Sequence, residues 1–185
     1  MSNNKAKPSW AKRLRTAALY IVLFSVVAFV VDAFRNSDVP ESVPAELSSL
    51  TDINGEQYNL REMSKDGPVV LYFWATWCPP CVKELPSMQA LRGQFAGEPF
   101  EVIAVNVGED PVDVSSFLNR IDAELEYPIL LDENMVAAKN WKVRALPTTY
   151  IIDPQGRARY IALGERDFGA PDVVSILRSL ALPDA

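Results

Sequence analysis

The only two cysteines of this 185-residue chain lie in the stretch Trp74-Ala75-Thr76-Trp77-Cys78-Pro79-Pro80-Cys81. Directly before it, residues 69–73 form a short, apolar and β-rich run, which is typical of a buried strand. After it, apolar residues recur between 82 and 95 at close to helical spacing. Cys78 is therefore predicted to lie where a central strand ends and a helix begins, the edge of an α/β sheet at which functional sites tend to lie. The free N–H groups and the dipole of a helix start favour an anion there, such as a thiolate.

Four kinds of site use a Cys-x-x-Cys pair. A zinc site needs about four ligands, and this chain has no histidine and no further cysteine. A c-type haem attachment has histidine directly after the second cysteine, where this chain has Val82. A structural disulfide closing so short a loop would constrain the unfolded chain little. The fourth kind, a redox-active dithiol, needs the strand-to-helix context predicted here, and the pattern favours it.

Two segments carry a resemblance to a known family. Residues 73–86, Phe-Trp-Ala-Thr-Trp-Cys-Pro-Pro-Cys-Val-Lys-Glu-Leu-Pro, resemble the active-site segment of the TlpA/ResA-like thioredoxins, which are membrane-anchored, extracytoplasmic thiol–disulfide oxidoreductases. Residues 143–153, Val-Arg-Ala-Leu-Pro-Thr-Thr-Tyr-Ile-Ile-Asp, resemble the cis-proline loop of that family and its following strand. The resemblance spans residues 44–182. Ala145 stands where the family often has glycine, and Tyr72 where cytosolic thioredoxins have a buried aspartate.

The predicted fold is a thioredoxin-like α/β sandwich, with a mixed central sheet flanked by helices. Strands alternate with helices along the chain, and a terminal hairpin and helix follow. The Asn54-Gly55 pair between β-prone residues adds a hairpin near the start of the domain. Strands are expected at 69–74, 100–107, 128–131, 148–152 and 159–163, and helices at 79–95, 111–121, 133–141 and from 171 onward.

The predicted reaction is thiol–disulfide exchange. Cys78, at the helix start, is expected to be the exposed nucleophile, and Cys81, about one turn inward, the buried resolving thiol. Glu84 matches a glutamate that ResA-like proteins carry near their cysteines. If partly buried, it would have a raised pKa and could relay the Cys81 proton; the alternative is an ordinary solvated helix glutamate.

The resemblance also implies roles for residues outside the dithiol. Pro147 is expected to be cis and to pack beside the two sulfurs. Its loop would offer the backbone of Leu146 to an extended target segment, like an added strand. Trp77 is expected to shield Cys78 and, together with Leu146 and Pro147, to bind the substrate, whereas Trp74 and Tyr72 are expected in the core. No cofactor or metal is predicted.

The N-terminal part predicts a membrane anchor. Residues 16–34 are apolar apart from Thr16, Ser25 and Asp32, and as a helix they would span about 28 Å, close to the thickness of a bilayer core. The basic tail 1–15 would lie in the cytoplasm, residues 35–47 would form a linker, and the domain 48–185 would lie on the periplasmic side of the inner membrane. A cleaved signal peptide is the alternative, because Val31-Asp32-Ala33 is an acceptable cleavage site.

The charge of the chain bears on its partners. The whole chain carries −6, and the first 31 residues contribute +5 through five basic residues, which leaves −11 for the rest. An acidic domain argues against binding nucleic acid. The expected partners are proteins with disulfides, a thiol–disulfide electron donor in the membrane, and the membrane itself.

The predicted function is a membrane-anchored reductase of protein disulfides. The resemblance implies substrates such as apocytochrome c or copper-site cysteines. Two alternatives stay open. The first is a peroxidase of the peroxiredoxin type, although its Pro-x-x-x-Thr-x-x-Cys pattern is absent here. The second is a carrier that holds Cu(I) on the two thiolates, although copper-delivery relatives of the fold also use a histidine, which this chain lacks.

Overall fold

The computed structural model describes residues 20, 22, 25, 49–121 and 124–181. The chain divides into two units, Met1–Asp38 and Val39–Ala185, and the second holds the elements that follow. Its strands are β1 (Ser49–Asp52), β2 (Gln57–Asn59), β3 (Val69–Trp74), β4 (Glu101–Val107), β5 (Ile129–Asp132), β6 (Thr148–Ile152) and β7 (Ala158–Leu163). Its helices are α2 (Leu60–Asp66), α3 (Pro79–Gln94), α4 (Pro111–Arg120), α5 (Val136–Asn140) and α6 (Pro171–Ala181).

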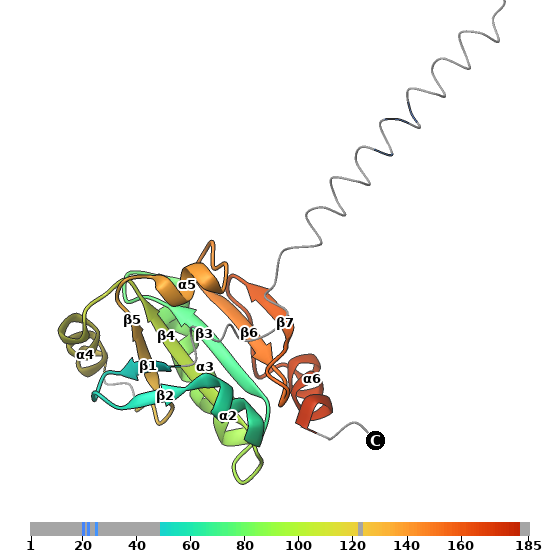
Figure 1. Cartoon of the computed structure of the whole chain (residues 1–185), viewed down its shortest axis with the longest axis horizontal. Helices are drawn as coiled ribbons and strands as arrows, with labels where there is room; N and C mark the ends of the chain where they lie inside the picture. Colours follow the sequence, from blue (N-terminus) through green and yellow to red (C-terminus); the bar gives the residue numbers. More distant parts are fainter. Residues whose placement is uncertain (1–19, 21, 23–24, 26–48, 122–123, 182–185) are drawn as a thin grey trace, which may run out of the picture. The chain divides into compact units, whose positions relative to one another are not determined.

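The strands form a seven-stranded mixed sheet in the order β2-β1-β5-β4-β3-β6-β7 (Figure 1). β3 pairs parallel with β4 and antiparallel with β6, and β5 runs parallel to β4 on its other side. The β1–β2 hairpin lies at one edge of the sheet, and β7 lies at the other. The carboxyl ends of β3, β4 and β5 therefore meet at one edge of the sheet. Cys78 follows β3 at this edge, where the sequence analysis predicted it.

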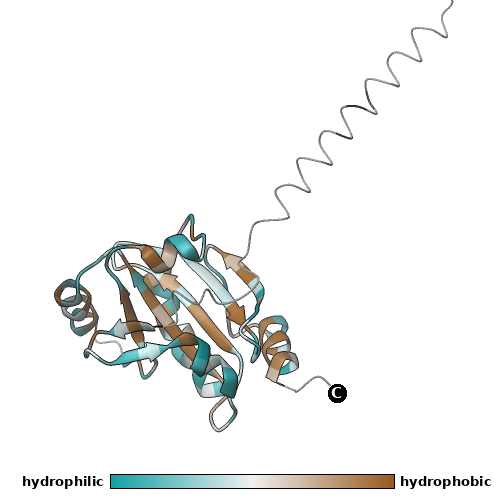
Figure 2. Cartoon of the chain, viewed as in Figure 1, coloured by the Kyte–Doolittle hydropathy of each residue, from teal (hydrophilic) through white to brown (hydrophobic). Residues whose placement is uncertain are grey.

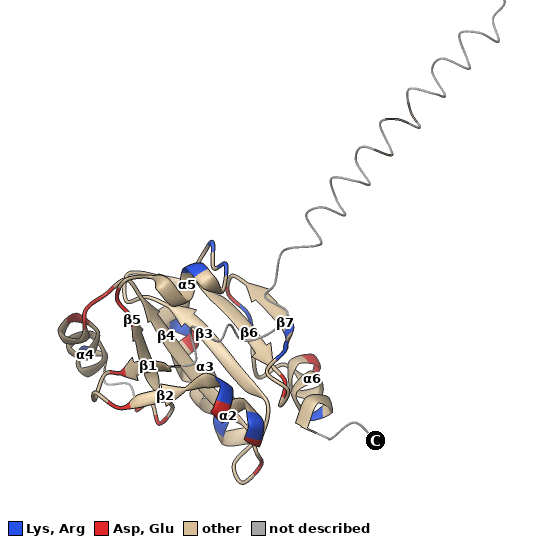
Figure 3. Cartoon of the chain, in the orientation of Figure 1, with Lys and Arg blue, Asp and Glu red and all other residues tan. Residues whose placement is uncertain are grey.

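The central strand β3 is buried on both faces of the sheet. Tyr72 and Trp74 enter an apolar cluster that contains buried residues of α3, α4 and α6. Phe73 enters a second cluster on the opposite face, where Trp141 and residues of α2 and α5 pack. A strand covered on both faces has a continuous apolar sequence rather than an alternating one. Figure 2 shows this concentration of hydrophobic residues on the central strands, and Figure 3 shows no charged residue on β3.

Helix α3 begins directly after the cysteine loop. Pro79 and Pro80 occupy its first turn, where a missing backbone N–H costs nothing because that group has no partner within the helix. Leu85, Met88 and Leu91 form its buried face against the sheet. This packing fixes the helix start, and with it both cysteines, against the end of β3.

Two elements differ from the prediction. The sequence analysis did not predict α2, a helix of only seven residues that is N-capped by the Asn59 side chain. The helix expected at 133–141 is shorter, because Met135 has a positive φ of 55° and α5 begins only after it. The buried carboxylate of Asp132 accepts hydrogen bonds from the N–H groups of Ala137 and Ala138 at 3.0 and 2.7 Å, which fixes that start.

The predicted tail 1–15, anchor 16–34 and linker 35–47 lie outside the described residues, apart from Tyr20, Val22 and Ser25, which are helical. Within the described part of the chain, no helix has the length and hydropathy needed to cross a membrane.

Candidate active site

The two cysteines lie at the junction of β3 and α3 and are joined by a disulfide, with their Cα atoms 5.3 Å apart. Cys78 is the N-cap residue of α3, with extended backbone angles and no side-chain cap. Its N–H donates to the Ala75 carbonyl at 3.2 Å, and its carbonyl accepts from the Val82 N–H at 3.1 Å. Both bonds fix the loop between strand and helix, so the dithiol is held on a rigid support.

The structure corrects the prediction that Cys78 is exposed. In this disulfide-bonded form Cys78 is only 4% exposed, and Cys81 is fully buried. The bond to Cys81 holds the Cys78 sulfur close to the helix, within the apolar cluster beneath. The neighbouring Trp77 is instead 67% exposed and forms part of the surface beside the disulfide.

The cis-proline loop approaches the same sheet edge. The Leu146–Pro147 bond is cis, as the sequence predicted. Thr148, the next residue, pairs with Phe73 near the end of β3. Pro147 is therefore held beside the loop that leads to Cys78, and its carbonyl accepts from the Gly164 N–H at 2.9 Å. Leu146 is half-buried and contacts both apolar clusters.

Glu84 is a buried carboxyl group, one turn beyond Cys81 on α3. Its side chain is only 3% exposed. One carboxyl oxygen accepts from the backbone N–H of Arg166, and the other has no hydrogen-bond partner among the described residues. Burial raises the pKa of Glu84, and this effect outweighs the Arg166 hydrogen bond and the nearby Tyr72 hydroxyl, which act to lower the pKa. The expected burial of Glu84 is confirmed and the solvated alternative is wrong, while its role as a proton relay stays a prediction.

The raised pKa of Glu84 leads to a stability prediction. The folded protein binds this proton more tightly than the unfolded chain, so stability falls as the pH rises from the unfolded pKa towards the folded one. Glu84→Gln is therefore expected to raise the free energy of unfolding at neutral pH, by about 1.4 kcal/mol for each unit of pKa shift, and with it the unfolding temperature. Below about pH 4 the two proteins should converge, because both then carry a neutral group. Thermal unfolding of both proteins from pH 3 to 8 would measure this difference in stability. A difference that stays the same over this pH range would contradict the prediction.

Comparison with known proteins identifies the family. The model of the AhpC/TSA family matches residues 42–161. The thiol-disulfide oxidoreductase ResA of Geobacillus kaustophilus is 33% identical over 153 residues, which cover 82% of this chain and 86% of that protein. ResA of Bacillus subtilis is also 33% identical, over 78% of this chain and 76% of its own length. The chain belongs to the AhpC/TSA family and is a ResA-type thiol-disulfide oxidoreductase.

Solved structures agree on the fold. The thiol:disulfide interchange protein DsbE from Chlorobium tepidum superposes with a TM-score of 0.65 at 24% identity, over 72% of this chain and 92% of that one. StoA from Bacillus subtilis gives a TM-score of 0.56 at 25% identity, over 64% and 88%. The ResA-type chain therefore has the thioredoxin-like α/β fold with a mixed sheet.

One residue near the ResA-type dithiol was missed by the sequence analysis. Glu109, in the loop after β4, accepts from the backbone N–H of Thr76 at 2.7 Å and from the Thr76 hydroxyl. It also accepts from the Asn106 side chain at 2.8 Å. These bonds fasten the loop before Cys78 to the neighbouring strand end. No local pattern signals the contact, because 33 residues separate the partners.

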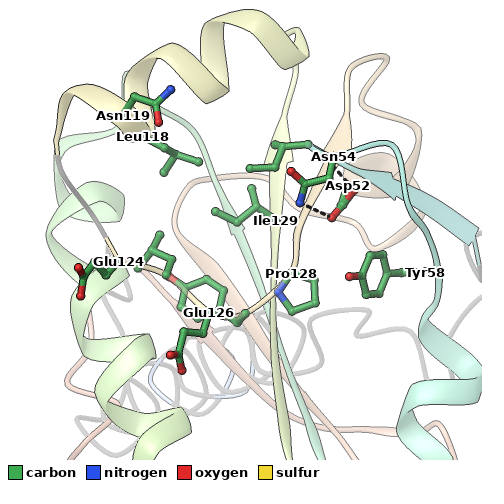
Figure 4. Close-up of a pocket in the computed structure, with 12 residues that line it drawn as sticks. Asp52, Asn54, Tyr58, Leu118, Asn119, Glu124, Glu126, Pro128 and Ile129 are labelled. Carbon is green, nitrogen blue, oxygen red and sulfur yellow. Dashed lines mark hydrogen bonds between the residues drawn. The ribbon is translucent and has the colours of Figure 1, made fainter.

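A hollow of about 370 Å³ lies away from the dithiol of the ResA-type domain (Figure 4). Residues of β1, of the end of α4 and of the segment before β5 line it, and none of the predicted site residues is among them. Its buried carboxylate, Asp52, is used by the hairpin turn, where it accepts from the Asn54 N–H at 2.8 Å and its side chain at 3.1 Å. This hollow therefore adds nothing to the redox site.

Proposed function

We propose that this ResA-type oxidoreductase reduces protein disulfides outside the cytoplasm while anchored to a membrane. The observation that supports this most is the placement of one dithiol, Cys78–Cys81, at a helix start, with the buried Glu84 one turn further along α3 and cis-Pro147 next to the strand residue that pairs with Phe73. Exchange needs no other oxidant or reductant, because the two electrons pass from the dithiol to the target disulfide.

Exchange begins at Cys78. Its thiolate attacks one sulfur of the target disulfide, the target S–S bond breaks, and a mixed disulfide forms. Cys81 then loses its proton and attacks the Cys78 sulfur, which releases the target as a dithiol and leaves Cys78–Cys81 oxidised. Cys81 is fully buried, so water is a poor acceptor for its proton. Glu84, one turn away and also buried, is our candidate acceptor.

The surface around the disulfide fits a polypeptide. Large apolar side chains that are more than half exposed gather where the sheet carries Cys78: Trp77, Val112, Met135, Val136 and Leu163. Each follows or ends a strand at this edge, since Val112 comes after β4, Met135 after β5, and Leu163 pairs with Thr148. An exposed apolar surface rimmed by polar groups is typical of an interaction site. We therefore place the docked protein target on this edge.

The function is tested by offering two oxidants to the reduced full-length chain. A reductase of protein disulfides consumes a protein disulfide such as that of oxidised insulin, with formation of Cys78–Cys81. Rapid consumption of hydrogen peroxide without thiol–disulfide exchange would instead favour the peroxidase alternative, which the match to the AhpC/TSA family also suggests. Ala75 and Leu71 occupy the threonine and proline positions of the peroxidase pattern, so we expect exchange and little peroxide consumption.

The membrane anchor and the physiological partners are part of the proposal. The apolar segment 16–34 after five basic residues supports a single-pass anchor with the domain on the periplasmic side. We expect the protein to stay with membranes after an alkaline carbonate wash and protease added outside to reach the domain. A mature form that begins at Phe34 would instead indicate a cleaved signal peptide. The resemblance to ResA-like proteins suggests apocytochrome c or copper-site cysteines as targets and a membrane thiol–disulfide protein as electron donor.

A further inference from the structure

Tyr72 connects the central strand to the resolving cysteine. It lies on β3 with its side chain fully buried on the α3 side. Its hydroxyl donates to the backbone carbonyl of Cys81 at 2.8 Å. That carbonyl lies in the first turns of α3, between Cys78 and Glu84 in the chain. Tyr72 therefore holds the turn of the helix that carries the resolving thiol.

Tyr72 is also close to Glu84. Burial and then Glu84 raise the pKa of Tyr72, so its hydroxyl keeps its proton at any working pH. In return, the nearby Tyr72 hydroxyl acts to lower the pKa of Glu84, against the larger effect of burial, while in this structure that hydroxyl donates to the Cys81 carbonyl. A phenol hydroxyl has one proton to donate and lone pairs to accept with. It therefore cannot donate to the Cys81 carbonyl and to a Glu84 carboxylate at the same time.

We propose that Tyr72 is a positioning residue that couples the protonation of Glu84 to the backbone of Cys81. When Glu84 is neutral, Tyr72 donates to the Cys81 carbonyl, which is the bond seen here, and the second carboxyl oxygen of Glu84 has no hydrogen-bond partner. When Glu84 has taken up a negative charge, Tyr72 turns its proton to the carboxylate and releases the Cys81 carbonyl. The carboxyl oxygen of Glu84 that lacks a partner in this structure is the group available for this exchange. This inference rests on the proposed role of Glu84.

The other groups around Glu84 leave this role to Tyr72. From the segment before α6, Arg166 contributes its backbone N–H, while its guanidinium binds Asp172 at 2.6 Å. On the surface, the ammonium of Lys83 pairs with Glu165. The two cysteines at the start of α3 form a disulfide, so neither has a thiol proton to donate to Glu84. Among the described side chains, Tyr72 carries the hydroxyl group that acts to lower the Glu84 pKa.

Tyr127 provides a matched control. It is also a buried tyrosine, and its hydroxyl donates to the Leu85 carbonyl of α3 at 3.0 Å, one turn beyond Cys81. Burial is the cause that raises its pKa, with no contribution from Glu84. Tyr127→Phe thus removes a similar hydroxyl that is bonded to the same helix and does not act on Glu84, although Tyr127 is a lesser cause of the raised Tyr72 pKa.

The experiment compares Tyr72→Phe, Tyr127→Phe and the unchanged full-length chain. The reduced proteins are mixed with 5,5′-dithiobis(2-nitrobenzoate), which releases one coloured thiolate when Cys78 attacks and a second when Cys81 resolves the adduct. We expect Tyr72→Phe to leave the first phase unchanged. We expect Tyr72→Phe to slow the second phase about tenfold near neutral pH. We also expect the pH at which the rate of this phase rises to shift about one pH unit higher, because a hydrogen bond to a charged group is worth about 1.5–3 kcal/mol. Tyr127→Phe should leave both phases unchanged.

Two further variants separate this inference from the proposed function. If Glu84→Gln leaves the second phase and its pH dependence unchanged, the role of Glu84 itself is wrong. If Glu84→Gln slows that phase but Tyr72→Phe does not shift its pH dependence, or Tyr127→Phe shifts it equally, the coupling through Tyr72 is wrong. In the double variant the Tyr72 substitution should cause no further shift, because no carboxyl remains to respond. Thermal unfolding verifies that both phenylalanine variants are folded.

Discussion

Replacing Cys78 with serine is expected to abolish disulfide exchange, whereas replacing Cys81 with serine is expected to leave the protein joined covalently to its target. A serine hydroxyl cannot form the attacking thiolate, and Cys81 is fully buried and cannot take over the first attack. With Cys81 replaced, the mixed disulfide on Cys78 forms but is not resolved. Electrophoresis without reductant, followed by mass spectrometry of the adduct, would reveal both outcomes and identify the target.

The unchanged chain is the control, since it should form the adduct only transiently. Exposure alone does not settle the order of attack, because Cys78 is itself only 4% exposed in the oxidised structure. The order follows from position: Cys78 is the N-cap of α3, whereas Cys81 lies within the helix. A Cys78→Ser protein that still reduced its target, or a trapped adduct on Cys81, would reverse the assigned roles.

The parts of the site that the sequence predicted are those that local pattern determines. The apolar run of β3, the proline-rich start of α3 and cis-Pro147 each depend on residues adjacent in the chain. Helix α2 escaped prediction because it has only seven residues, mostly polar, and its start depends on the Asn59 side chain. A helix this short has almost no periodicity to detect.

The parts that could not be predicted depend on residues distant in the chain. Spacing places Glu84 near Cys81, but the backbone N–H that donates to its carboxyl group belongs to Arg166, 82 residues away. The hydrogen bond from Thr76 to Glu109 joins residues that are 33 positions apart in the chain. The burial of Cys78 follows from the disulfide and the packing of α3 on the sheet, neither of which a local motif reports. Tertiary contacts therefore decide the electrostatics of the site, while local pattern decides its location.

The equilibrium of the dithiol is expected to favour the disulfide, so that the protein acts as a reductant. A dithiol is oxidising when its thiolate is strongly stabilised, and few groups stabilise Cys78 here. Pro79 and Pro80 carry no N–H at the helix start. Lys83 is exposed and paired with Glu165, so its charge contributes little. Glu84, when ionised, would oppose a second negative charge beside it. The helix start remains as the stabiliser, and we expect a Cys78 pKa only modestly below the free value of about 8.5.

Redox equilibration against glutathione, together with thiolate absorbance against pH, measures both quantities. We expect a potential nearer to that of thioredoxin, about −270 mV, than to that of the strong oxidant DsbA, about −120 mV. This difference of about 150 mV is about five orders of magnitude in the equilibrium constant. Glu84→Gln is the matched variant, because it removes the opposing charge and should lower the Cys78 pKa and make the potential less negative. A Cys78 pKa near 4 in the unchanged chain, or a potential as oxidising as that of DsbA, would show that the helix start dominates and that the protein donates disulfides instead of reducing them.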